Sequence, residues 1–145
     1  MALNPFFLQG SKSEQHLVQD LINETISMHG IEFIYMPRIF VNTKTVLREV
    51  TTSKFDRAFP IEGYIESYEG FDSGYNMLTK FGVRSTAEMK VLISQVRYKE
   101  YITPLLTGVT GLSKDPTRPL EGDLLWFPLR DILFEIKYVD DVHNF

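Results

Sequence analysis

Cysteine is absent from this 145-residue chain. Its absence excludes disulfide bonds, thiolate metal ligands and thiol nucleophiles together, and it fits a protein made in a reducing compartment. Long apolar runs are missing as well, since none approaches the roughly 20 residues that a membrane-spanning helix needs. We therefore expect a soluble, cytosolic chain that makes no membrane contact.

Positive charge is scarce and scattered. The chain has 15 lysines and arginines against 19 aspartates and glutamates, which gives a net charge of −4. Binding that depends on neutralising phosphates needs clustered basic side chains, so a strongly basic nucleic-acid-binding face is not predicted. Hydrophobic residues make up 43% of the sequence and charged residues 23%, as is ordinary for one folded domain.

Signatures of catalysis are also missing. The sequence contains no G-x-S-x-G, no phosphate-binding glycine-rich loop and no H-E-x-x-H. His16 and His29 are thirteen positions apart, and the acidic tail at 140–143 is typical of a solvated chain end. Glu62 and Glu66 would lie about 13 Å apart along a strand, too far for the paired carboxylates of a glycosidase. We predict no enzyme activity, no metal site and no cofactor.

The first thirty residues divide into an arm and a helix. The capping-box spacing of Ser11 and Glu14 precedes apolar residues at helical intervals, and Gly30 ends the pattern. We predict an extended arm over 1–10 and one long helix within 11–30, from Ser13 to His29. The arm either packs on its own core or docks on a neighbouring subunit, so its candidate interface residues are Asn4, Pro5, Phe6, Phe7 and Leu8.

Beyond Gly30 the apolar residues alternate, as in strands. Strands are predicted in "IEFIYMPRIFV" (31–41), "PIEGYIESYEG" (60–70) and "EMKVLISQVRY" (88–98), the last being the best candidate for a central strand. Segment 45–55 reads as a polar connection or a weak strand, 76–82 as one short helical turn, and the glycine- and proline-rich segment 103–121 as a long mobile loop. The predicted fold is mainly β: a single domain over 1–145, with residues 31–145 forming a small β-barrel or sandwich behind one long N-terminal helix.

The last two apolar runs, "LLWFP" and "ILFEIKYV", are separated by a hairpin-length loop and should pair with each other. The first of them is apolar on both faces, so both faces need a cover. We predict that Trp126 lies in the core and that the N-terminal helix, through Leu17, Leu21 and Met28, covers the second face. A neighbouring subunit or a further segment of chain is the alternative cover.

An oligonucleotide-binding barrel of the OB type is an alternative function. Tyr64 and Tyr68 share a strand face and could stack on bases. However, Glu62 and Glu66 occupy the same face and would repel phosphate. Exposed aromatic side chains in an acidic protein favour protein–protein contact instead.

The order of several segments resembles the neck proteins of T4-type tailed bacteriophages. These segments are "LNPFF", "SEQHLVQDLINETISMHGIEFIYMPRIFVN", "AFPIEGYIESYEGF", "LTKFG" and "EGDLLWFPL", followed by "LFEIKYV". The resemblance covers essentially the whole chain and is carried by order and spacing, because no catalytic signature is involved. Proteins of this family are longer than 145 residues, so the resemblance also implies that the chain is incomplete and lacks structure that would pack on its last strand.

The resemblance implies a structural protein of the virion neck, assembled in the host cytoplasm. Such a protein forms a ring, expected to be a hexamer, that completes the DNA-filled head and offers the tail a docking surface. The implied partners are further copies of the chain, a portal-proximal neck protein, a tail terminator or tail-end protein, and packaged DNA bound without sequence specificity. Lys114 and Arg118, in the long predicted loop, are the candidates for facing DNA in the channel. Another tail or baseplate module is the remaining alternative.

Overall fold

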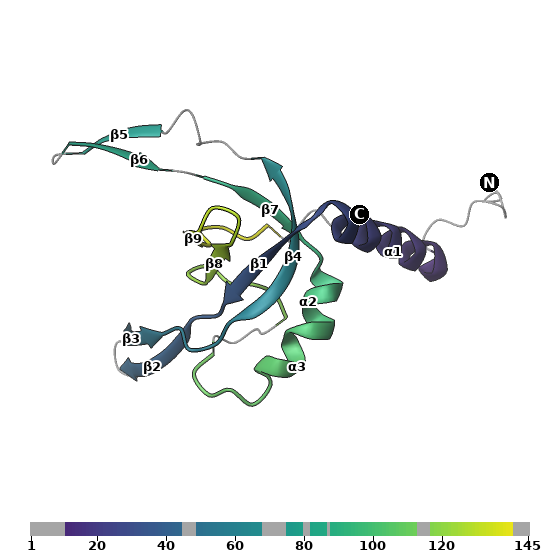
Figure 1. Cartoon of the computed structure of the whole chain (residues 1–145). Helices are drawn as coiled ribbons and strands as arrows, with labels where there is room; N and C mark the ends of the chain where they lie inside the picture. The colour runs from purple at the N-terminus through teal and green to yellow at the C-terminus, as the bar shows by residue number, and fades with distance from the viewer. Residues whose placement is uncertain are drawn as a thin grey trace, which may run out of the picture.

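The structure is a computed structural model that describes residues 11–44, 49–67, 75–79, 82–86, 88–112 and 117–140. Its elements in these ranges follow the order α1 (Lys12–His29), β1 (Ile31–Met36), β2 (Ile39–Lys44), β3 (Glu49–Lys54), β4 (Phe59–Ser67), β5 (Tyr75–Thr79), β6 (Gly82–Thr86), β7 (Lys90–Ile93), α2 (Gln95–Tyr101), α3 (Thr103–Leu106), β8 (Leu124–Phe127) and β9 (Ile132–Glu135). The predicted class, mainly β with one long N-terminal helix, is confirmed (Figure 1).

A curled five-stranded antiparallel sheet, a half-barrel, forms the body of the fold. The strand order is β7-β4-β1-β8-β9, so β1 is central although it comes first in the chain. The strands β2 and β3 form a hairpin of their own, and so do β5 and β6. The predicted pairing of the two last apolar runs is confirmed, because β8 and β9 pair antiparallel with Leu125 opposite Phe134.

The inner face of the sheet carries the core. Alternation in β1 and β4 turns Phe33, Tyr35 and Ile61 inward and leaves Glu62 and Tyr64 outside. The rings of Phe33 and Phe127 stack with centroids 5.3 Å apart. The helices α2 and α3 close this face with three buried side chains: Tyr98, Ile102 and Leu106.

Three local predictions were wrong. The predicted central strand at 88–98 is the four-residue edge strand β7 followed by helix α2. The change occurs at Ser94, whose hydroxyl accepts a hydrogen bond from the Arg97 N–H at 3.4 Å and so caps α2. A short helix, α3, opens the predicted loop at 103–121, with Pro104 in its first turn. In place of the predicted helical turn at 76–82, residues 76–79 belong to β5 and Gly82 begins β6, which pairs with it.

The helix α1 has the predicted extent but not the predicted cap. Ser11 is its N-cap, yet the Ser11 hydroxyl pairs with that of Ser13 at 2.8 Å, and no side-chain cap bond forms. Gly30 ends the helix for a steric reason, because a Cβ there would collide with the carbonyl oxygen of Ile26. The Gly30 N–H donates to that same oxygen at 2.7 Å, so the chain turns tightly into β1.

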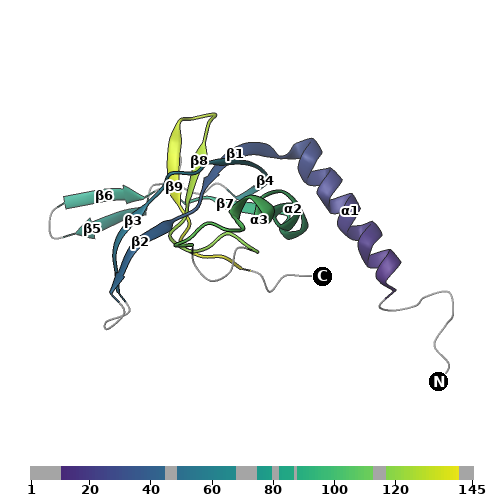
Figure 2. The same ribbon diagram turned by 90° about the horizontal axis from the view of Figure 1, so that it is seen from below.

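The prediction that α1 covers the second face of β8 was wrong, and so was the core position of Trp126. The helix projects from the body (Figure 2) and meets β4, while Leu17, Leu21 and Met28 remain 53–71% exposed. Trp126 pairs with Ile34, which faces outward, so the buried neighbours in β8 are Leu125 and Phe127. The Trp126 Nε1 donates to Asp131 at 3.0 Å at the exposed hairpin turn.

Candidate functional site

A buried polar cluster lies on the inner face of the sheet, at the central strand β1. It is built from one residue each of β1, α2 and the turn before β8. Tyr35 donates to the Asp123 carboxylate at 2.5 Å, and Tyr98 donates to the Tyr35 hydroxyl at 3.1 Å. The same carboxylate accepts the backbone N–H groups of Arg38 at 2.8 Å and Leu120 at 2.9 Å. Asp123, Tyr35 and Tyr98 are each at most 3% exposed.

This cluster joins β1, α2 and the 120–123 turn through hydrogen bonds between neutral phenols and one carboxylate. Burial raises the pKa of Tyr35 far above its usual value, with the charges of Tyr98 and Asp123 adding to the effect. Burial also raises the pKa of Tyr98, to about 12. Both phenols are therefore neutral at physiological pH and act only as hydrogen-bond donors and acceptors. The carboxylate holds the 120–123 turn against β1, which sets the start of β8.

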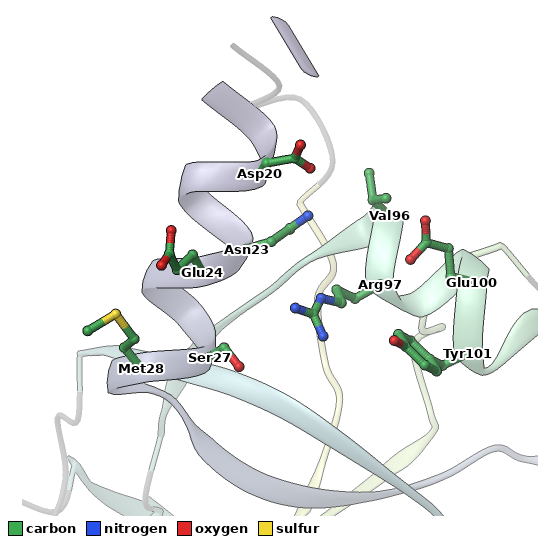
Figure 3. Close-up of a pocket in the computed structure, with 9 residues that line it drawn as sticks. All are labelled: Asp20, Asn23, Glu24, Ser27, Met28, Val96, Arg97, Glu100 and Tyr101. Atoms are coloured by element: carbon green, nitrogen blue, oxygen red, sulfur yellow. The ribbon is translucent and has the colours of Figure 1, made fainter. Parts of the chain in front are cut away.

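A hollow of about 550 Å³ separates α1 from α2 (Figure 3). The Oδ1 of Asn23 in α1 accepts a hydrogen bond at 2.5 Å from the hydroxyl of Ser94, the N-cap of α2, and this bond ties the two helices together. The same oxygen accepts from Gln19, also in α1, at 3.1 Å. Arg97 points across the hollow, and its guanidinium lies 6.0 Å from the ring centroid of Tyr101. The lining residues are Asp20, Asn23, Glu24, Ser27, Met28, Val96, Arg97, Glu100 and Tyr101.

Of the sequence-predicted site residues, the structure describes only Arg118. The arm residues Asn4 to Leu8 and the loop residue Lys114 lie outside the described residues. Arg118 is described and half-buried, shortly before the 120–123 turn. In the part of the chain that the structure describes, no three His, Asp or Glu side chains gather as metal ligands. Likewise, no helix within the described ranges is long and apolar enough to cross a membrane.

A family model described as virus neck protein, of the T4 type, matches residues 1–145, the whole chain. The chain belongs to the T4-type virus neck protein family. No solved structure matches it significantly. Membership assigns the chain a structural role in the phage neck, a place in the virion, and contacts with other head or tail components. The family is structural, which agrees with the expectation that the chain is no enzyme.

The outer face of the sheet carries a row of apolar side chains. Cross-strand pairs place Pro60, Ile34, Trp126 and Leu133 in one row across β4, β1, β8 and β9. Ile34 and Trp126 are half-buried, and Leu133 is 54% exposed. No helix among the described elements lies over this row, which stays open to another surface.

Sequence reasoning missed the buried cluster and the hollow. Asp123 was visible only as part of a turn, because an aspartate beside a glycine usually means a solvated loop. Asn23 and Ser94 looked like ordinary helix and strand residues. What marks these two residues is a hydrogen bond between positions 71 apart in the sequence, and local periodicity does not reveal such a contact.

Proposed function

We propose that the chain is the ring-forming subunit that completes the DNA-filled head and gives the tail its docking surface. The match of the neck family to all 145 residues carries this proposal. The ring is hexameric, with a portal-proximal neck protein on one side and a tail terminator or tail-end protein on the other. Assembly takes place in the host cytoplasm.

The apolar outer face supports the proposal that each subunit needs a neighbour to cover part of its sheet. The row of Ile34, Trp126 and Leu133 would be unfavourable in water, and α1 does not cover it. The neighbouring copy in the ring supplies the cover. Each subunit of a cyclic ring has two different contact surfaces, and this face is one of them.

Packaged DNA passes through the ring without sequence-specific contact. Lys114 and Arg118 are the side chains that we propose to face it, because they are the basic residues of the segment between α3 and β8. Replacing both with glutamate should reduce DNA retention in filled heads. Unchanged retention would remove these two residues from the channel.

The ring is tested with two matched substitutions. Leu133 on β9 and Leu105 on α3 are 54% and 55% exposed, so Leu133→Glu and Leu105→Glu change equally accessible side chains. Light scattering and electron microscopy should show that Leu133→Glu abolishes the hexamer and that Leu105→Glu leaves it intact. A wild-type chain that is monomeric at every concentration and binds single-stranded DNA with a steep salt dependence would overturn the proposal in favour of an OB-type binder.

A further inference from the structure

We propose that the hollow between α1 and α2 is a peptide-binding groove, and that its occupant is the N-terminal arm of a second copy of the chain. This inference rests on the proposed ring, because it names one of the contacts that would join neighbouring subunits. It concerns the helices α1 and α2, whereas the outer-face row lies on the sheet.

The first observation is a hydrogen-bond donor that has no partner within the described residues. The Ser94 hydroxyl accepts from the Arg97 N–H, so its own proton goes to Asn23. This direction fixes the Asn23 amide with Oδ1 towards Ser94 and Nδ2 away from it. Asn23 is only 9% exposed, and Figure 3 shows its amide nitrogen pointing from α1 into the hollow.

A buried amide nitrogen without an acceptor is unfavourable, so an occupant that offers a carbonyl oxygen is favoured. An extended peptide presents such oxygens at regular intervals along its backbone. The residues that line the hollow also offer apolar and aromatic surface to a side chain of that peptide. Val96 is 38% exposed and Tyr101 62% exposed, and the Arg97 guanidinium lies over the Tyr101 ring. These groups suit an aromatic or large aliphatic anchor.

Charge selects among the segments of this chain that could enter. The hollow is lined by three carboxylates, Asp20, Glu24 and Glu100, against the single guanidinium of Arg97. Residues 1–10 contain no acidic residue and include Phe6 and Phe7. The segment 141–145 begins with an aspartate directly after Asp140 and would be repelled. The arm therefore fits in both charge and anchor.

Chain length favours the arm of another copy. Four residues lie between Phe7 and Lys12, the first residue of α1, and the five Cα–Cα steps span at most about 17 Å when extended. Tyr101 lies level with Ser27 (Figure 3), fifteen residues and about 22 Å along the helix from Lys12. Even in a fully extended arm, the Cα of the chain's own Phe7 stops about 5 Å short of that level, whereas the arm of a neighbouring subunit has no such limit.

The absence of cysteine from the chain makes a direct test possible. Two full-length single-cysteine variants, Phe7→Cys and Tyr101→Cys, are mixed in equal amounts and treated with a short thiol-reactive crosslinker. The control mixture pairs Phe7→Cys with Leu129→Cys, because Leu129 is 69% exposed at the β8–β9 turn, away from the groove. Mass spectrometry counts the mixed dimers.

The proposal predicts at least tenfold more mixed dimer with Tyr101→Cys than with Leu129→Cys. Equal yields overturn it. A Phe7→Cys/Tyr101→Cys double variant that crosslinks only within one chain overturns the assignment to a second copy. Light scattering on the same samples separates the two proposals: a multimeric chain without the adduct refutes the groove alone, and a chain that is monomeric at every concentration refutes both.

Discussion

Replacing Asp123 with alanine should be among the most damaging single substitutions in this fold. The carboxylate accepts hydrogen bonds from the Tyr35 hydroxyl and from the N–H groups of Arg38 and Leu120, at 2.5 to 2.9 Å. Alanine would leave the buried Tyr35 hydroxyl and the two partly buried N–H groups without this acceptor, each unfavourable by about 1 to 3 kcal/mol. Alanine also removes a charge that is unfavourable to bury, and this offsets part of the loss. We therefore expect the free energy of unfolding to fall by about 3 to 5 kcal/mol.

A graded series of variants tests the same reasoning. Asp123→Asn keeps one oxygen but turns its amide nitrogen towards an N–H donor in either orientation, and should lose about 1 to 3 kcal/mol. Tyr35→Phe removes one donor and leaves the Tyr98 hydroxyl without its acceptor, with a similar loss. Tyr98→Phe removes only the outermost hydrogen bond, at 3.1 Å, and should lose about 0.5 to 1.5 kcal/mol.

Urea unfolding, followed by the fluorescence of the single tryptophan, measures each free energy. Asp56→Ala is the control, because Asp56 is exposed and its ion pair with Lys54 is exposed as well, and it should leave the unfolding midpoint nearly unchanged. If Asp123→Ala lost less than about 1 kcal/mol, or if Tyr98→Phe lost more than Asp123→Ala, the carboxylate would not organise the cluster and our account would be refuted.

Four other outcomes are expected. The pKa values of Tyr35 and Tyr98 are raised in the folded protein, so the stability that the two neutral phenols contribute is fully present below pH 10, the usual tyrosine pKa. As pH rises from 10 towards 12, the free energy of unfolding should fall by about 1.4 kcal/mol per pH unit for each phenol. Urea unfolding of the double phenylalanine variant should show a flatter pH profile. Gly63→Ala would place a Cβ 2.6 Å from the Val91 Cγ1 and lose about 1 to 3 kcal/mol, and adding Val91→Ala should recover part of that in the same assay. Leu21→Ala, at a 53% exposed site, should change subunit stability by less than about 1 kcal/mol while sedimentation shows weaker assembly; a loss of 2 kcal/mol or more would return Leu21 to the core. Deleting residues 1–9 should also weaken assembly with cooperative melting retained, and a collapse of melting would show that the arm belongs to its own core.

The parts of the fold that follow from local pattern were predictable. Alternation of Phe33 and Tyr35 with Ile34 and Met36 identified β1 and separated its two faces, and the helical spacing before Gly30 identified α1. The hairpin of β8 and β9 followed from two apolar runs joined by a short loop. In each case one element presents its own periodic signal, and no distant contact changes it.

The parts that depend on one side-chain contact were not predictable. Met89, Val91 and Ile93 are in phase for a strand, and the strand exists, but the Ser94 hydroxyl caps a helix that begins one residue later. A serine after a strand pattern is equally compatible with a continued strand, a turn or a cap. Its hydrogen bond with Asn23, 71 positions away, distinguishes these possibilities only after folding.

The misplacement of α1 has a different physical origin, because the helix is apolar on two opposite sides. Ile22 and Ile26 face the subunit's own body, and Leu17 and Leu21 lie about half a turn around the helix and remain exposed. Periodicity reports that a face is apolar but not which molecule covers it. The outer side of β8 presents the same ambiguity, since Trp126 and Leu133 form an apolar row that nothing described in the chain covers. Two uncovered apolar surfaces on different elements, α1 and the sheet, are what a ring subunit requires, since each copy must offer its two neighbours different faces.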